Sequence, residues 1–311
     1  MQTSNLPTCR KVIFWSALVI AILPATAGTC SSAAGLQVNP SFPSEKTPEP
    51  QSQTGANVDV KTGYANVNGL KMYYEIRGSG RPIVLLHGGC STIETSFGKV
   101  LNALAKSRQI IGVEQQGHGH TADIERPMTF EQMADDTAEL LKQLKVKKAD
   151  VLGYSDGGSV AIGIAVRHPD LVRKLVVVGT NYNPGGYYPE VLEFRKNAKP
   201  EDVPAELQAA YAKVAPDPNH WPEFVSKVSK MGIDFDGWSS EQIKSIASPT
   251  LVMIGDSDFV RPEHAVEMFR LLPHAQLAIV PGADHGVLDQ RPEWVRSMLE
   301  AFLNAPMPDA K

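Results

Sequence analysis

The chain has 311 residues, of which 42% are hydrophobic and 21% are charged, and its net charge at pH 7 is −4. It contains no basic cluster, which excludes nucleic acid and anionic membrane surfaces as expected partners. About 250 residues, from 59 to 306, have the size and composition of one globular α/β domain. The cysteines are Cys9, Cys30 and Cys90.

Residues 1–27 have the layout of a secretory signal peptide. Arg10 and Lys11 form a basic start, residues 12–23 are almost entirely apolar, and small residues follow up to Ala27. The apolar run is short for a bilayer span, so we expect cleavage after Ala27, with an uncleaved membrane anchor as the alternative. The expected location is therefore secreted or periplasmic.

A flexible linker is expected over residues 28–58, because this segment has too few large apolar groups to offset the cost of ordering it. Cys30 also allows lipid attachment, although Thr29 is larger than the residue that usually precedes a lipidated cysteine. A membrane partner is expected only if Cys30 is lipidated or the signal peptide is retained. Cys90 would then be the one cysteine of the globular domain, so no internal disulfide is expected.

Eight apolar runs predict the strands of a sheet. Asn68-Gly69 separates the first two runs and is a strong hairpin signal, so we expect an antiparallel pair at one edge. The other runs alternate with helix-like stretches, which indicates a mostly parallel sheet covered on both faces. The expected strands are residues 64–67, 70–76, 82–86, 109–113, 151–154, 174–178, 250–254 and 276–280.

Helix-like segments fill the spaces between these strands. Thr129 is a suitable cap for one of them, and Gln132 occupies the position that completes a capping box. The expected helices are residues 97–106, 130–144, 158–168, 262–272 and 292–303.

Residues 181 to about 247 interrupt the alternation, since they carry no strand signal and are rich in aromatic residues. Short helices are expected there at residues 189–197, 203–214, 221–230 and 241–246. Such an insertion is typical of a small helical lid over the active edge of a sheet. We expect most of its aromatic side chains to attach it to the body and some to favour an apolar or aromatic substrate group.

The expected strand 151–154 runs into a helix through Gly-x-Ser-x-Gly at residues 153–157. A serine at such a junction lies on a tight turn, and the glycines let neighbouring backbone approach while the hydroxyl stays clear of the sheet. This geometry suits a serine nucleophile. A glycine-rich turn without chemistry can have the same sequence, so the assignment depends on the rest of the chain.

Four motifs together resemble the α/β-hydrolase fold superfamily, especially its small bacterial esterases with a Gly-Tyr-Ser-Asp-Gly-Gly elbow. They are Leu-His-Gly-Gly at 86–89, the elbow at 153–157, Gly-Asp-Ser-Asp at 255–258 and Gly-Ala-Asp-His-Gly at 282–286. The resemblance implies a mostly parallel sheet of about eight strands, helices on both faces and a small helical lid. It covers nearly the whole domain, which we place at residues 59–306.

A serine nucleophile needs a base within hydrogen-bond reach, and the pKa of histidine suits that role. His285 is the expected base, because it lies in a glycine-rich loop after the last expected strand. The resemblance implies Asp258 as the acid that orients the histidine and leaves Asp256 in a turn. Asp284 is expected to order the histidine's loop. We therefore predict that Ser155, Asp258 and His285 converge.

Acyl transfer also needs fixed N–H donors for the oxygen that becomes negative. The backbone N–H of Asp156 is one candidate, because it begins a helix. The second donor is expected from the loop after residues 82–86, with Gly89 implied by the resemblance and Cys90 as the alternative. His87 is expected to shape this loop, and the Asp156 side chain is expected to cap the helix.

The loop at residues 114–120 departs from the superfamily pattern. Many members have Asp-x-Arg-Gly-x-Gly there, whereas Gln116 takes the arginine position in this chain. His118 and His120 are close in sequence, but no cysteine or acid pair accompanies them, so no metal site is expected. Dinucleotide and phosphate-loop motifs are absent from the sequence, and no cofactor is expected.

These patterns predict an exported serine hydrolase that cleaves small or medium carboxylic esters through an acyl-enzyme intermediate. Lactone, thioester, amide and carbon–carbon bond hydrolysis and cofactor-free perhydrolysis use the same triad, so they stay open as alternatives. A ligand-binding protein on a hydrolase scaffold is the alternative from another class, although a complete triad favours catalysis. The natural substrate and the oligomeric state do not follow from the sequence.

Overall fold

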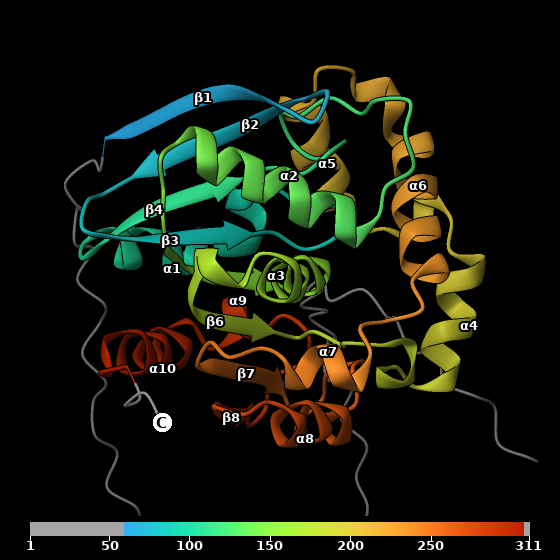
Figure 1. The fold of residues 1–311 in the computed structure, drawn as a ribbon. Coiled ribbons are helices and arrows are strands. Elements are labelled where there is room, and N and C mark those ends of the chain that lie inside the picture. The colour runs from blue at the N-terminus through green and yellow to red at the C-terminus, as the bar shows by residue number, and fades with distance from the viewer. Residues whose placement is uncertain (1–58, 308–311) are drawn as a thin grey trace, which may run out of the picture. The chain divides into compact units, whose positions relative to one another are not determined.

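The computed structural model describes residues 59–307, so the expected signal peptide and linker lie outside the described residues. Eight strands form one sheet in the order β1-β2-β4-β3-β5-β6-β7-β8 (Figure 1). They are β1 (Val60–Val67), β2 (Leu70–Arg77), β3 (Arg81–Leu86), β4 (Arg108–Val113), β5 (Ala149–Tyr154), β6 (Val172–Val178), β7 (Thr250–Gly255) and β8 (Ala275–Val280). The α/β fold with a mostly parallel sheet is confirmed.

The antiparallel part of the sheet is confined to one edge. β1 pairs with β2 through a two-residue turn, in which Asn68 and Gly69 have φ angles of 47° and 85°. β2 is antiparallel to β4, and the six strands from β3 to β8 are parallel to their neighbours in this set. Parallel strands need helical crossovers, so helices bury both faces of this part of the sheet.

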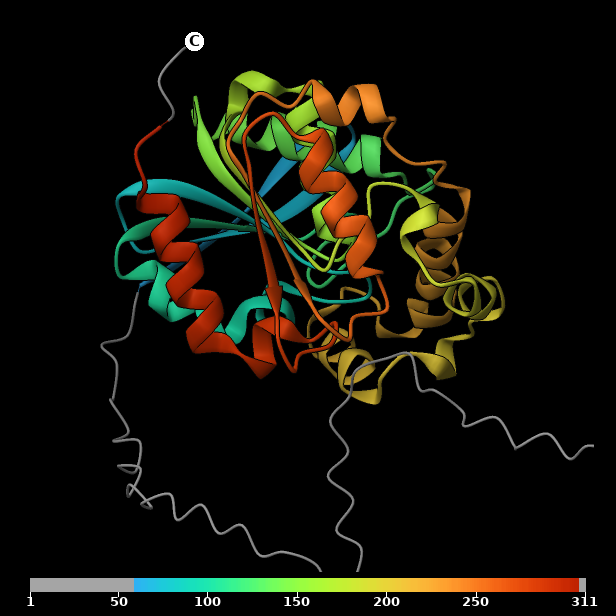
Figure 2. The ribbon, with the colours of Figure 1, turned by 90° about the horizontal axis from the view of Figure 1, so that it is seen from below.

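Two helical layers cover the sheet (Figures 1 and 2). One layer shares a hydrophobic core with one face of the sheet. It consists of α1 (Ile93–Ala105), α9 (Val287–Gln290) and α10 (Pro292–Asn304). The other layer packs on the opposite face and consists of α2 (Phe130–Gln143), α3 (Asp156–Arg167) and α8 (Pro262–Leu271).

Local hydrogen bonds account for the starts of two helices, of which α2 starts at Phe130 as expected. α1 begins four residues before the expected start, because Thr92 and Thr95 form a reciprocal capping box. At α2, Thr129 accepts the N–H of Gln132 at 3.1 Å, as expected of a cap. The Gln132 side chain, however, donates to Asp136 at 2.9 Å, so the second half of that capping box is not formed.

The long connection from β6 to β7 is helical, and it contains α4 (Pro189–Asn197), α5 (Ala205–Val214), α6 (Trp221–Asp234) and α7 (Ser240–Lys244). Figure 1 shows α4 and α6 beyond the arrowhead end of β6. Aromatic packing holds this insertion together, since Phe224 is fully buried and its ring stacks on Tyr211 at 5.0 Å. Within residues 59–307, no helix has both the length and the hydrophobicity that a membrane span requires.

Candidate active site

Ser155 lies on the turn between β5 and α3, and its φ angle of 54° is in the left-handed region that favours glycine. The glycines around it allow this strained turn. A Cβ on Gly157 would lie 2.1 Å from the carbonyl oxygen of Leu86, and one on Gly153 would lie 2.2 Å from the carbonyl oxygen of Gly157. Both positions therefore exclude any larger residue.

Three side chains from separate loops form a continuous hydrogen-bonded relay. His285 Nε2 lies 2.9 Å from the Oγ of Ser155, and His285 Nδ1 lies 2.9 Å from Asp258 Oδ1. The N–H of Val260 donates to the same carboxylate oxygen at 3.0 Å. The loops follow β5, β7 and β8, and carboxyl ends of parallel strands share one edge of the sheet. The structure thus brings together all three side chains for which the sequence predicted convergence.

Gly179, which sequence reasoning missed, makes room for this relay. Its φ angle is 59°, and a Cβ there would lie 3.0 Å from His285 Nδ1 and 3.2 Å from Asp258 Oδ2. A side chain would therefore strain the backbone and press on the imidazole–carboxylate contact. The signal in the sequence was a glycine directly after the expected strand 174–178.

Two aromatic side chains that the sequence analysis did not single out hold His285. The hydroxyl of Tyr154 donates to the backbone carbonyl of His285 at 2.9 Å, and burial raises the pKa of Tyr154 well above its usual range, so it stays protonated. The ring of Phe259 contacts the imidazole with a centroid distance of 3.9 Å. The histidine is therefore fixed at both its backbone and its ring.

The neighbouring carboxylates order the loops around the relay. Asp256 accepts the N–H of Gly282 at 3.0 Å, and Asp284 accepts the N–H of Gly286 at 2.8 Å. Neither is the carboxylate that contacts His285. The structure therefore distinguishes Asp258 from its two rivals by position.

Two free backbone donors lie beside the elbow. Within residues 59–307, no protein group accepts a hydrogen bond from the N–H of Gly89 or Asp156, whereas Gly88 N–H donates to Ser96. The loop after β3 is close to the turn at Ser155, since a Cβ on Gly88 would lie 3.2 Å from that of Ser155. These two donors suit stabilisation of an oxyanion. Cys90 directly follows Gly89. Its thiol is buried, and burial raises its pKa.

The Asp156 side chain does not cap α3, contrary to expectation. The helix begins at Asp156 itself, and the cap position belongs to Ser155, whose side chain makes no capping hydrogen bond. The carboxylate instead faces Gly89, where a Cβ would lie 2.3 Å from Asp156 Oδ2. Its Oδ1 lies 3.9 Å from Nη2 of Arg195 on α4. A helix residue thus directs a negative charge toward the insertion.

Gln116 and its neighbours organise the loop after β4. The Gln116 side-chain amide donates to Asp123 at 2.8 Å. The same carboxylate binds Lys227 at 2.7 Å and contacts His220 at 2.9 Å, and both belong to the insertion. Burial alone would raise the pKa of Asp123, but these hydrogen bonds lower it. The loop therefore attaches the insertion to the body by charge.

The loop histidines have separate protein partners. His120 contacts Glu114 at 2.8 Å, a hydrogen bond that raises its pKa, whereas burial lowers the pKa of His118 well below its usual value. His87 accepts the N–H of Gln115 at 3.1 Å, so it ties the loop after β3 to the loop after β4. Within the described residues, no three histidine, cysteine or acidic side chains are grouped as metal ligands.

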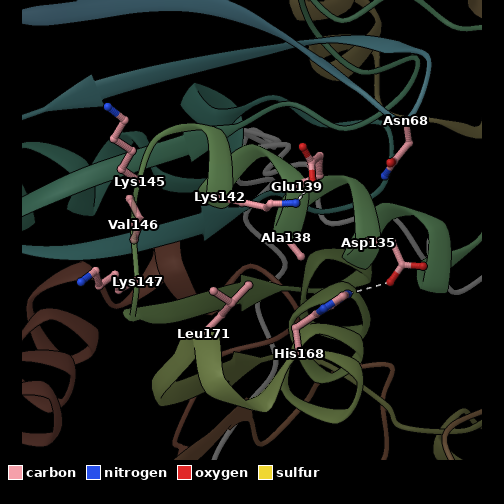
Figure 3. Close-up of a pocket in the computed structure, with 10 residues that line it drawn as sticks. All are labelled: Asn68, Asp135, Ala138, Glu139, Lys142, Lys145, Val146, Lys147, His168 and Leu171. Atoms are coloured by element: carbon pink, nitrogen blue, oxygen red, sulfur yellow. Dashed lines mark hydrogen bonds and ion pairs between the residues drawn. The ribbon is translucent and has the colours of Figure 1, made fainter.

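A hollow of about 650 Å³ lies away from the relay (Figure 3). The lysines 142, 145 and 147 line it, together with a pair formed by His168 and Asp135 at 2.7 Å. It contains none of the relay residues and opens broadly to solvent. Its charges are mixed, so it has no chemistry comparable to that of the elbow.

The fold and the relay define a hydrolase. The sequence profile of the Alpha/beta hydrolase family matches residues 83–297, and the chain belongs to that family. Serine hydrolase BPHL of Mus musculus is 25% identical over 254 residues, which cover 78% of this chain and 87% of that protein. The sn-1-specific diacylglycerol lipase ABHD11 of Mus musculus is 28% identical over 71% of this chain and 80% of its own.

A solved structure supports the fold assignment. The meta-cleavage product hydrolase CumD of Pseudomonas fluorescens IP01 superposes with a TM-score of 0.64, at 22% identity over 78% of this chain and 97% of that chain. At this identity the likeness concerns the fold alone. The residues of this chain itself, rather than this likeness, therefore indicate its substrate.

Proposed function

We propose that this chain is an exported serine hydrolase that cleaves carboxylic esters. The observation that carries the proposal is the relay in which His285 contacts Ser155 and Asp258 at 2.9 Å each. A hydroxyl, an imidazole and a carboxylate in this order are what nucleophilic acyl transfer requires. The lipase among the relatives acts on an ester lipid, as its name states, and this supports an ester as substrate.

Each group has a role in the proposed reaction. Ser155 Oγ attacks the ester carbonyl while His285 Nε2 takes its proton, and the Asp258 carboxylate stabilises the imidazolium that forms. The N–H groups of Gly89 and Asp156 receive the oxyanion. His285 then protonates the departing alcohol and leaves an acyl group on Ser155. Water, activated by the same imidazole, releases the acid and restores the serine.

The proposal is tested by hydrolysis of p-nitrophenyl esters of increasing acyl length, with Ser155→Ala measured alongside. We expect the variant to lose at least about 10³-fold in kcat/KM, because the remaining groups cannot supply a nucleophile. A fluorophosphonate probe should label Ser155. Equal activity of the two proteins, or labelling at another residue, would refute the assignment. Ligand-induced stabilisation without product would support a binding protein instead.

Export is a separate part of the proposal and rests on the sequence of residues 1–27. The intact mass of protein recovered from the culture medium or periplasm tests it. A mass that begins at residue 28 is expected. A full-length mass in the membrane fraction would indicate a retained anchor, and a mass with an added diacylglycerol at Cys30 would indicate a lipoprotein.

A further inference from the structure

Arg195 lies near the elbow, and the hydrolytic mechanism does not use it. It lies on α4, and 20% of its side chain is exposed. Its guanidinium lies over the ring of Tyr187, with a centroid distance of 5.1 Å. Its charge contact with Asp156 is long, at 3.9 Å, and no protein group within residues 59–307 accepts a hydrogen bond from its guanidinium.

An arginine that is largely buried without hydrogen bonds is unusual. The guanidinium has five N–H donors and stays charged, so leaving it unpaired away from bulk water is costly. A protein tolerates such a cost where a ligand completes the site. The five donors form a fork that matches a carboxylate, which can accept two parallel hydrogen bonds.

Two helices of the insertion position the guanidinium of Arg195. α4 supplies Arg195, and Gly232 of α6 provides the space for it, because a Cβ there would lie 2.2 Å from Nη2 of the guanidinium. Any larger residue at position 232 would displace the side chain. The insertion therefore holds the cation in place by shape as well as by charge.

A chain of ring contacts connects Arg195 to the relay. Tyr187 lies beneath the guanidinium and faces Phe259 at 6.1 Å, and Phe259 lies against the imidazole of His285 at 3.9 Å. Tyr187 is tied to the segment after Asp258 by a backbone bridge to Val260. On the other side, Asp156 directly follows the nucleophile. Ser155, Asp156, Tyr187 and Phe259 are all partly exposed, so solvent reaches this side of the elbow.

We infer that Arg195 binds a carboxylate carried by the substrate, and that the preferred substrates are esters with a free carboxylate, such as half-esters of dicarboxylic acids. The inference rests on the proposed function, because it names the substrate class of the same site. The aromatic pair Tyr187 and Phe259 would line the apolar chain between the carboxylate and the reacting carbonyl. The Asp156 carboxylate lies 3.9 Å from the same cation and repels any added anion, so the site is expected to hold no more than one substrate carboxylate.

A purely structural role for Arg195 is the competing explanation. In that case its contact with Asp156 would join α4 to the elbow, and its loss would affect all substrates alike. A substrate carboxylate predicts a selective effect. Matched pairs of esters that differ only in a terminal carboxylate separate the two explanations.

The first experiment compares monoethyl glutarate with ethyl pentanoate, and monoethyl adipate with ethyl hexanoate. We expect the protein to prefer the acidic ester of at least one pair by about 10-fold or more in kcat/KM, the scale of one charge-assisted contact. Arg195→Met should reduce that preference at least about 10-fold through KM, and Arg195→Lys should reduce it less. Lys196→Met, which removes a neighbouring exposed cation of α4, is the matched control and should keep the preference.

Equal losses on the acidic and neutral esters in Arg195→Met and Arg195→Lys would overturn the inference. So would the absence of any preference in the unmodified protein. The melting temperatures of all variants show whether the insertion is still folded.

A second measurement separates this inference from the proposed function. Calorimetric binding of glutarate and adipate to Ser155→Ala, with and without Arg195→Met, requires no turnover. Binding that depends on Arg195, in a protein that hydrolyses no ester, would refute the proposed function and retain the carboxylate site. Ester hydrolysis with neither preference nor binding that depends on Arg195 would refute the carboxylate site and retain the proposed function.

Discussion

The carboxyl edge of the sheet and the helical insertion are built in different ways. At the edge, closely packed backbone surrounds the reacting groups: a Cβ on Gly157 would collide with a carbonyl oxygen, and a Cβ on Gly179 would crowd the relay. The insertion is held largely by side chains, including the contact of Asp123 with Lys227. Backbone contacts tolerate little change, whereas side-chain contacts can be replaced. We therefore expect changes at the edge to reduce the rate and changes in the insertion to alter substrate choice.

The largest expected effect tests the edge directly. Asp258→Asn should lower kcat by about 10³–10⁴-fold, because an amide in place of the carboxylate favours the wrong imidazole tautomer. Asp256→Asn is the matched control, since that carboxylate accepts from Gly282 and Ser257, whereas the carboxylate that contacts His285 is Asp258. It should retain most of the activity. Similar losses in the two variants would contradict the assignment of Asp258 as the orienting acid.

Gly179→Ala tests whether the backbone shape of the edge matters as much as its side chains. The added methyl would lie 3.0 Å from His285 Nδ1, so kcat should fall by about 10²-fold through displacement of the imidazole. Gly69→Ala is the control, because Gly69 also has a positive φ angle but no atom lies within 4 Å of the place that its added methyl would occupy. That variant should lose stability by about 1 kcal/mol and keep its kcat. Unchanged kcat in Gly179→Ala would show that the edge is more adaptable than we argue.

The contact between α8 and the start of the insertion should lose stability as the pH falls. His264 of α8 is 1% exposed and stacks on Tyr182 at the start of the insertion. Burial lowers the pKa of His264 from 6.5 to about 4, and its Nε2 already accepts the N–H of Tyr182. Below pH 6.5 the unfolded chain binds a proton that the folded chain excludes. Stability should therefore fall by up to about 3 kcal/mol as the pH decreases to 4.

Urea unfolding at pH 7 and at pH 4.5 measures this acid sensitivity. His264→Gln should show a smaller difference between the two pH values, because it removes the titrating group. His274→Gln, which replaces an exposed histidine, is the control. If His264→Gln leaves the stability difference between pH 7 and pH 4.5 unchanged, a group other than His264 causes the acid sensitivity.

The smallest expected effect concerns a positioning residue. Tyr154→Phe removes the hydrogen bond to the His285 carbonyl and keeps the ring, so kcat should fall by about 3- to 10-fold with little change in KM. Stability should fall by about 1 kcal/mol. Tyr64→Phe, at an exposed site on β1, should change neither quantity. A loss confined to KM would indicate that Tyr154 contacts substrate instead.

The sequence predicted the eight strands and their alternation with helices, because strands buried on both faces are continuous apolar runs and helices buried on one face have a period near 3.6 residues. The predicted ends of the helices were less accurate. The early start of α1 was missed because Thr95 takes the place of the Glu or Gln usual in a capping box, and α9 is too short to show a period. The Asp156 side chain was misassigned as a cap, because a motif does not show whether the helix starts at a residue or after it.

The amino-acid order by itself determined the strained serine turn, the glycines around it and the candidates for base and acid. These are local patterns, and short-range sterics and periodic burial produce them. Only the tertiary structure decided that Asp258 rather than Asp256 contacts His285, that Gly179 must lack a side chain, and that Arg195 lies beside the elbow. Each of these depends on strands or helices that meet only when distant segments pack, and no local pattern encodes that distance.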